Sequence, residues 1–128
     1  MGNAGYHILV AEDTSVLAIM LKRTLEGAGF AVTVAKNGRE AWERAQEVQF
    51  DVIVTDQQMP EMSGTELCAK LRQLDRYAET PVIMVTAKAY ELDTEKMHAD
   101  LNIHPVFTKP FSPKKVLQVV EERVSVSS

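Results

Sequence analysis

Five polar side chains stand at the ends of short apolar segments of the sequence: Glu12, Asp13, Asp56, Thr86 and Lys109. Carboxylate oxygens are the hard ligands that Mg²⁺ prefers, and the ion usually takes one or two of them while it keeps waters and substrate oxygens. A cation beside Asp56 would offset the repulsion between a carboxylate nucleophile and an anionic phosphoryl group. Lys109 could act as a point charge on the phosphoryl oxygens, and Thr86 could donate a hydrogen bond to them. The chemistry of these residue types together fits a phosphoryl acceptor that works with Mg²⁺.

The apolar segments themselves have the length and the β-branched content of strands that are buried on both faces. They are His7–Ala11, Ala31–Ala35, Asp51–Thr55, Pro81–Thr86 and Ile103–Thr108. Segments with helical spacing separate them, and such alternation predicts a parallel sheet with helices on both faces. Right-handed crossovers restrict the topology to a doubly wound α/β fold. Ligands of such folds bind beyond the carboxyl ends of the strands, which is where the five polar side chains stand.

Two of the helical segments carry specific expectations about packing. The first is expected to bury a stripe made of Val16, Leu17, Met20, Leu21, Leu25 and Ala28. The fourth, roughly residues 90–101, is expected to be the weakest helix, because it holds five charged residues. Its apolar face is thin and consists of Tyr90, Met97 and Leu101.

Each polar residue has an ordinary structural explanation when it is taken singly. Asp13 could cap the first helix, Thr86 could simply end a strand, and Lys109 could be a solvated surface lysine. A purely structural origin does not explain why four strand ends carry such residues at the same edge of the sheet. The coincidence favours a shared site.

Composition excludes several classes of protein. The chain has 128 residues, of which 45% are hydrophobic and 25% charged, with a net charge of −4, as expected of one globular domain. Lysine and arginine are scattered, which argues against direct nucleic-acid binding. Cys68 is the only cysteine, so an internal disulfide is impossible and a cytoplasmic location is expected. No apolar run approaches the ~20 residues of a membrane span, and the N-terminus lacks the features of a signal peptide.

Two enzyme classes compete with a signalling module. A nucleotide-dependent Rossmann enzyme would need a glycine-rich turn after the first strand, but the sequence there is Ala11-Glu12-Asp13-Thr14-Ser15. A phosphohydrolase of the haloacid-dehalogenase type would carry a D-x-D pattern after its first strand, and a cap for its substrate. The chain lacks the D-x-D pattern, and its 128 residues leave little room for a cap. A third possibility, a degenerate module that binds partners without being phosphorylated, is disfavoured because every site residue is present.

Several motifs follow one another along the chain: Leu9-Val10-Ala11-Glu12-Asp13, the segment from Asp51 to Asp56, Met59-Pro60 with Gly64, the segment from Pro81 to Ala87, and Lys109-Pro110-Phe111. On these motifs, the sequence resembles the response-regulator receiver domain of bacterial two-component (phosphorelay) signalling. The likeness covers about residues 6–124, which we take as the domain, with flexible tails expected at 1–5 and 125–128. It implies a (βα)5 flavodoxin-like fold with a five-stranded parallel sheet in the order 2-1-3-4-5.

The same resemblance implies a role for each site residue. Asp56 would receive the phosphoryl group from a histidine kinase or a histidine phosphotransfer protein. Asp13 and Asp56 would bind Mg²⁺ directly together with the backbone carbonyl of Gln58, and Glu12 would act mostly through a metal-bound water. The protein would be a signalling receiver, not an enzyme, that catalyses only its own phosphoryl transfer and hydrolysis.

Thr86 and Lys109 would contact the phosphoryl group after transfer, according to the resemblance. The family also usually has a cis peptide before the proline that follows the lysine, here Lys109–Pro110. The sequence without the resemblance favours trans, since only about 5–6% of X–Pro bonds in folded proteins are cis.

One position departs from the family pattern. Many receivers carry an aromatic residue three positions before the lysine, where it changes rotamer on activation. This chain has Val106 there, with Phe107 beside it. The output partner, or a fused output domain, is expected on the surface of the fourth helix, fifth strand and fifth helix. No further domain follows the last helix, so the chain is expected to be a stand-alone regulator or a receiver excised from a longer protein.

Overall fold

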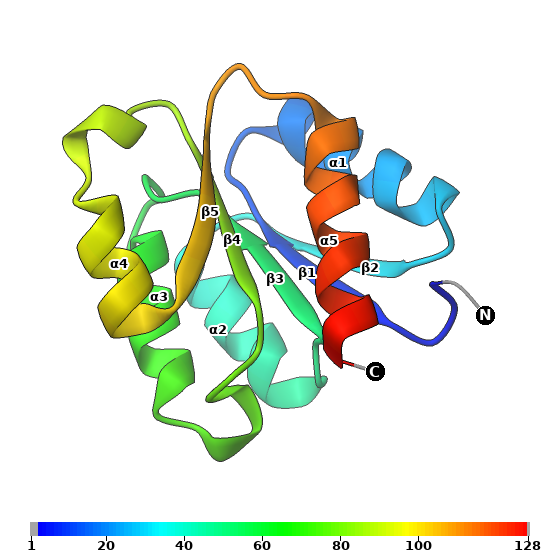
Figure 1. The fold of residues 1–128 in the computed structure, drawn as a ribbon, viewed down its shortest axis with the longest axis horizontal. Helices are drawn as coiled ribbons and strands as arrows, with labels where there is room; N and C mark the ends of the chain where they lie inside the picture. Colours follow the sequence, from blue (N-terminus) through cyan, green and yellow to red (C-terminus); the bar gives the residue numbers. More distant parts are fainter. Residues whose placement is uncertain (1–2, 128) are drawn as a thin grey trace.

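The computed structural model of the chain describes residues 3–127. Strands and helices alternate along the chain as β1 (His7–Ala11), α1 (Ser15–Gly27), β2 (Ala31–Ala35), α2 (Gly38–Glu47), β3 (Val52–Thr55), α3 (Gly64–Arg72), β4 (Val82–Thr86), α4 (Thr94–Leu101), β5 (Ile103–Thr108) and α5 (Pro113–Ser127). All strand pairs are parallel, and the order across the sheet is β2-β1-β3-β4-β5. The predicted fold class and strand order are therefore confirmed (Figure 1).

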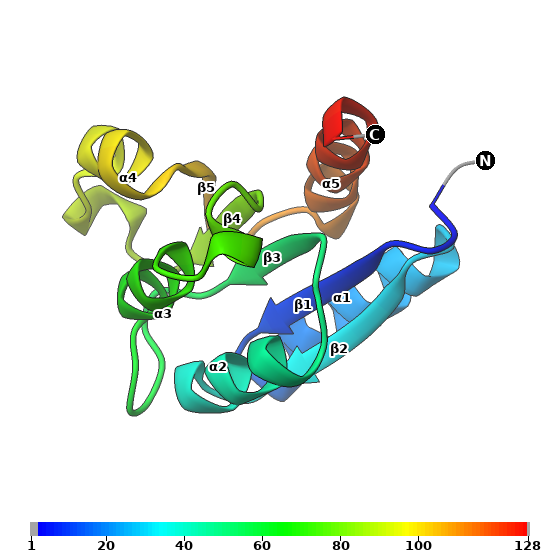
Figure 2. The same cartoon turned by 90° about the horizontal axis from the view of Figure 1, so that it is seen from below.

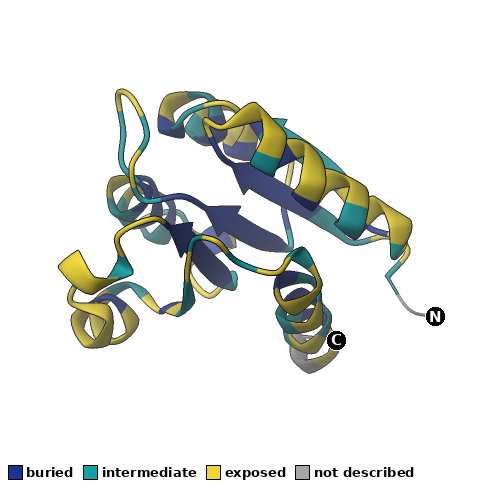
Figure 3. Cartoon of the chain, turned by 90° about the horizontal axis from the view of Figure 1, so that it is seen from above, coloured by how far each residue is buried: buried dark blue, intermediate teal, exposed yellow. Residues whose placement is uncertain are grey.

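The sheet lies between two layers of helices, and each layer has its own apolar core (Figure 2). In β1, Leu9 and Ala11 pack toward α2, α3 and α4, whereas Ile8 and Val10 pack toward α1 and α5. Successive side chains of a strand point to opposite faces, so a strand covered on both faces must be apolar at every position. This explains the continuous apolar segments of the sequence. The central strands β1, β3 and β4 form the buried centre of the molecule, and the outer faces of the helices are exposed (Figure 3).

The expected buried stripe of the first helix is partly wrong. Leu21 and Leu25 are buried as expected, but Val16 and Met20 are 66% and 43% exposed. The helix buries Ala18, one turn before Leu21, in their place. The face of α1 that packs on the core is a narrow stripe. Val16 and Met20 lie outside this stripe and, with Ile19, form an exposed apolar surface.

The fourth helix is shorter than expected. It begins at Thr94, because the Asp93 side chain accepts a hydrogen bond from the Lys96 backbone N–H at 3.0 Å and so caps the helix there. Tyr90 lies before this cap, in a short 3-10 turn from Ala89 to Glu91, and is 80% exposed instead of packed. Within α4 only Met97 is buried, which agrees with the expected weak packing.

Described residues near both ends of the chain have defined structure. The Asn3 side chain donates hydrogen bonds to the backbone oxygen of Ala28 and to Glu121 Oε2, at 2.7 and 2.9 Å. At the other end, α5 continues to Ser127. Residues 1, 2 and 128 lie outside the described residues, and the domain limits 6–124 stay a prediction. Within residues 3–127, no helix is long and apolar enough to cross a membrane.

Gly64 allows α3 to begin directly against β3. A Cβ atom at this position would overlap the backbone oxygen of Asp56 and touch the Met84 side chain. Gly64 therefore permits a close approach of helix and strand that no other residue type allows at this place. The approach brings the first turn of α3 to the carboxyl end of β3.

Candidate functional site

Backbone hydrogen bonds of the sheet place the predicted site residues at one edge. The N–H of Asp56 donates to the Ala11 oxygen at 2.9 Å, which sets Asp56 beside the Glu12–Asp13 pair. The N–H of Lys109 donates to the Thr86 oxygen at 2.8 Å, which sets these two residues side by side. The shared edge that the sequence predicts is thus a direct result of the parallel register.

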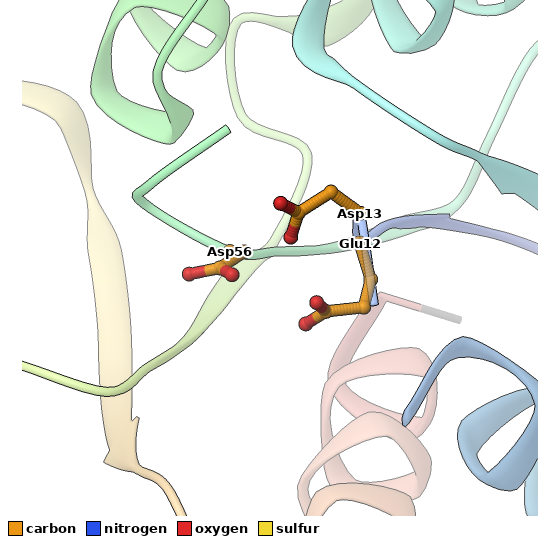
Figure 4. A group of neighbouring side chains, drawn as sticks. All are labelled: Glu12, Asp13 and Asp56. Atoms are coloured by element: carbon orange, nitrogen blue, oxygen red, sulfur yellow. The ribbon is translucent and has the colours of Figure 1, made fainter. Parts of the chain in front are cut away.

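Three carboxylates converge at this edge (Figure 4). One oxygen from each of Glu12, Asp13 and Asp56 lies within 4.8 Å of the others, a spacing that can hold a metal ion. Glu12 and Asp56 are 2% and 4% exposed, whereas Asp13 is exposed. Buried like charges at such distances repel one another unless a cation compensates them.

Lys109 supplies one such cation. Its Nζ lies 2.9 Å from Asp56 Oδ2 and 3.1 Å from Glu12 Oε1, and its side chain is only 16% exposed. Burial on its own would lower the pKa of the lysine, but the hydrogen bonds to Asp56 and Glu12 outweigh burial and raise that pKa above its usual value. Lys109 therefore remains a charged ammonium that bridges the two buried carboxylates.

A single ammonium does not compensate three carboxylates. Burial raises the pKa of the Glu12 carboxyl, although the Thr14 backbone N–H and Lys109 act against that rise. The Asp56 charge raises it further. Three ionised carboxylates and one ammonium carry a net charge of −2, which a single divalent cation would neutralise.

The second oxygen of Asp56 is held by the chain that follows it. Asp56 Oδ1 accepts hydrogen bonds from the backbone N–H groups of Gln57 and Gln58, at 2.6 and 3.3 Å. Lys109 occupies the other oxygen, so both carboxylate oxygens have fixed directions. A carboxylate held in this way needs little reorganisation before it reacts or binds a metal.

Thr86 ends β4 with a buried hydroxyl that is 1% exposed. Its Oγ1 has no hydrogen-bond partner within the part of the chain that the structure describes. A buried hydroxyl without a partner carries a desolvation cost of about 1–3 kcal/mol. The Thr86 hydroxyl is therefore available to a ligand that enters the site.

Several sequence expectations have different outcomes around the site. The Lys109–Pro110 peptide is cis, as the family resemblance implies, and a second cis peptide joins His104 and Pro105. Gln58 is exposed, and its backbone N–H bonds Asp56.

The sequence did not predict the role of Gln57, whose side chain bonds the start of α3, because a contact across eight residues leaves no periodic signal. It also gave no hint that the rings of His98 and His104 stack, 4.5 Å apart.

Val106 and Phe107 face opposite sides of the sheet. Val106 stands opposite Met84 in the β4–β5 pairing and packs on the core under α2, α3 and α4. Phe107 packs on the core under α1 and α5. Phe107 therefore cannot stand in for the aromatic residue that many receivers carry at the place of Val106.

Comparison with known proteins agrees with this geometry. The family model for the response regulator receiver domain matches residues 8–121. The crystallised chemotaxis protein CheY4 of Vibrio cholerae is 31% identical, with a TM-score of 0.84, over 93% of this chain and 98% of that protein. The probable transcriptional regulator ycf29 of Porphyra purpurea is 34% identical over 93% of this chain. The alignment takes in 56% of that regulator, and the chain spans about half the length of the curated relatives it matches.

A further solved structure contains a metal. The receiver domain of the sensor histidine kinase PA1611 from Pseudomonas aeruginosa has a magnesium ion coordinated in its active-site cleft. It is 24% identical, with a TM-score of 0.84, over 95% of this chain and 99% of that domain. At that identity the likeness shows the fold alone.

The pairing of Lys109 with buried carboxylates gives a testable prediction for the metal-free protein. Lys109→Met should lower the free energy of unfolding by about 3 kcal/mol, because it leaves Asp56 and Glu12 without their cation. Adding Asp56→Asn to that variant should restore part of the loss, with a coupling energy of about 1 kcal/mol or more. Urea unfolding in EDTA measures both. Lys115→Met on the exposed side of α5 is the matched control and should be nearly neutral. Strictly additive effects would mean that Lys109 and Asp56 do not interact.

Proposed function

The chain belongs to the response regulator receiver domain family, and we propose that it is a phosphoprotein switch in which Asp56 accepts a phosphoryl group with the help of Mg²⁺. Receiver domains are signalling modules of two-component systems, and the donor would be a phosphohistidine on a histidine kinase or phosphotransfer protein. The observation that carries the proposal is the setting of Asp56, which is 4% exposed between two further carboxylates and the ammonium of Lys109.

The residues at the edge fit a magnesium ion. Asp13 and Asp56 would bind it directly with the backbone carbonyl of Gln58, and Glu12 would reach it through a water. The three carboxylate oxygens, which lie within 4.8 Å of one another, support this donor set. The magnesium ion in the receiver domain of PA1611 is a parallel. The bound ion would supply positive charge to the phosphoryl oxygens as they approach the carboxylates.

Transfer would proceed as an exchange of one bond for another. A carboxylate oxygen of Asp56 forms a bond to phosphorus while the phosphorus–nitrogen bond of the donor breaks, and the imidazole nitrogen leaves with the electron pair. The product is an aspartyl phosphate.

Lys109 and Thr86 would then bind the new group. The ammonium of Lys109 lies 2.9 Å from Asp56 Oδ2 and has a short distance to move to a phosphoryl oxygen. The Thr86 hydroxyl, which has no hydrogen-bond partner in the described chain, would gain one. Thr86 would make this hydrogen bond only in the phosphorylated protein. Phosphorylation would therefore stabilise the arrangement of β4 in which the bond forms.

The structural change at the site would be transmitted to the surface through the segment after Thr86. Ala87 and Lys88 are exposed, and α4 beyond them buries only Met97, so this segment has low local stability. Val106 is β-branched, so its χ1 angle is restricted, and its small side chain sweeps out little volume when it rotates. The surface of α4, β5 and α5 is the proposed face for an output partner or a fused output domain. We propose a cytoplasmic protein that does not itself bind nucleic acid.

The acceptor assignment predicts a simple labelling result. Acetyl phosphate with Mg²⁺ should add one phosphoryl group to the protein, and Asp56→Asn should abolish the addition, as measured by intact mass. Asp75→Asn, at an exposed aspartate of a 3-10 turn, is the matched control and should be labelled normally. Stoichiometric labelling of Asp56→Asn would refute the assignment.

The proposed route of the signal predicts where amide exchange changes. Beryllofluoride with Mg²⁺, which mimics the phosphoryl group, should alter hydrogen exchange most in residues 86–101, because the hydroxyl of Thr86 gains its partner there. Val106→Ala should leave this pattern largely intact. A flat response in residues 86–101, with the largest change in 103–108, would show that β5 carries the signal instead.

A further inference from the structure

Gln57 uses all of its polar groups to join the acceptor aspartate to α3. Its backbone N–H donates to Asp56 Oδ1 at 2.6 Å, and its backbone oxygen accepts from the Gly64 N–H at 3.0 Å. Its side-chain Oε1 accepts from the Thr65 N–H at 2.8 Å, and Nε2 donates to Thr65 Oγ1 at 3.1 Å. One residue thus holds an Asp56 oxygen with its main chain and the first turn of α3 with its side chain.

The first turn of a helix has N–H groups without partners inside the helix, and here loop residues take them. Ser63 Oγ accepts from the Glu66 N–H at 3.2 Å, and the Glu66 side chain returns the bond to the Ser63 N–H. The Gln57 side chain takes the donor that remains, the N–H of Thr65. The start of α3 is therefore a fixed anchor, and Gln57 connects it to the loop after Asp56.

The anchor also fixes the peptide unit between Gln57 and Gln58. The carbonyl of this unit accepts from Gly64, and its N–H donates to Asp56 Oδ1 at 3.3 Å. A peptide unit is planar, so bonds at both of its ends set its orientation. That orientation determines where the chain enters Gln58, whose own carbonyl is the proposed third protein ligand of Mg²⁺.

We propose that Gln57 is a positioning residue for the magnesium site, whose side chain, bonded to Thr65, holds Asp56 Oδ1 and the Gln58 carbonyl in place for the ion. It contacts neither the ion nor the phosphoryl group. The proposal rests on the proposed function, since it assumes that Mg²⁺ binds at this edge. Groups that orient metal ligands typically change metal affinity by 10–100-fold when they are removed. A residue that only capped α3 would change stability and leave metal affinity alone.

The test measures Mg²⁺ affinity by calorimetry and stability by urea unfolding on the same variants. Gln57→Leu removes both side-chain hydrogen bonds at similar size and should weaken Mg²⁺ binding about tenfold. Thr65→Val removes the hydroxyl that accepts from Nε2 and that also bonds Ser63 Oγ at 3.2 Å, and it should weaken binding about threefold. Thr65→Ser keeps the hydroxyl and should bind Mg²⁺ as the wild type does. Gln46→Leu is the matched control, because the Gln46 side chain bonds its own helix, through the Trp42 oxygen, away from the carboxylate edge.

Labelling by acetyl phosphate separates positioning from chemistry. The labelling rate of Gln57→Leu should approach the wild-type rate at saturating Mg²⁺, since only the affinity for the ion has changed. If Gln57→Leu binds Mg²⁺ with wild-type affinity but is less stable, the inference is overturned, and Gln57 only caps α3. If Gln57→Leu does not fold, equal affinities of Thr65→Val and Thr65→Ser would overturn it. A wild-type protein that neither binds Mg²⁺ nor is labelled would instead overturn the proposed function itself.

Discussion

Lys109 Nζ lies 2.9 Å from Asp56 and 3.1 Å from Glu12, in a setting where these carboxylates are almost completely buried. Buried charges are tolerated only when they are paired and hydrogen-bonded, so this bridge is a condition for placing acidic groups at the end of an apolar sheet. The parallel register brings the three chain segments together, and the bridge makes their proximity stable. It still leaves negative charge in excess, and that excess is the basis of the proposed site for a divalent cation.

The sheet and the carboxylate cluster were predictable from sequence because both depend on strong, regular signals. Strands buried on both faces are apolar without interruption, and the observed β1, β2 and β5 have the predicted bounds. Parallel strands also end at one edge by geometry, so Glu12, Asp13, Asp56 and Lys109 had to meet there. Tyr90 could not be placed in this way, because whether a helix begins at residue 90 or 94 depends on a cap, Asp93, that competes with the preceding turn. Val16 and Met20 likewise have helical spacing but fall outside the narrow stripe of α1 that packs on the sheet.

The fold restrains α4 unevenly, which bears on how a change at the site reaches the surface. Arg72 donates to the Leu101 oxygen at 2.9 Å and, from Nη1, to the oxygens of Tyr77 and Thr80 at 2.7 Å each. The carboxyl end of α4 is therefore tied to α3 and to the loop before β4. Its amino end follows the exposed residues after Thr86 and is capped only locally, by Asp93. A shift that begins at Thr86 meets the less restrained end of the helix first.

Thermal unfolding with and without Mg²⁺ tests the central claim, that excess negative charge at the carboxyl edge binds a divalent cation. The account predicts that the melting temperature of the wild-type protein rises with Mg²⁺, by the equivalent of about 1.4 kcal/mol when the ion is at ten times its dissociation constant. Sodium chloride of equal ionic strength should not reproduce the rise, and Asp13→Asn should remove most of it. A wild-type melting temperature that does not respond to Mg²⁺, or one that responds equally in Asp13→Asn, would contradict the account.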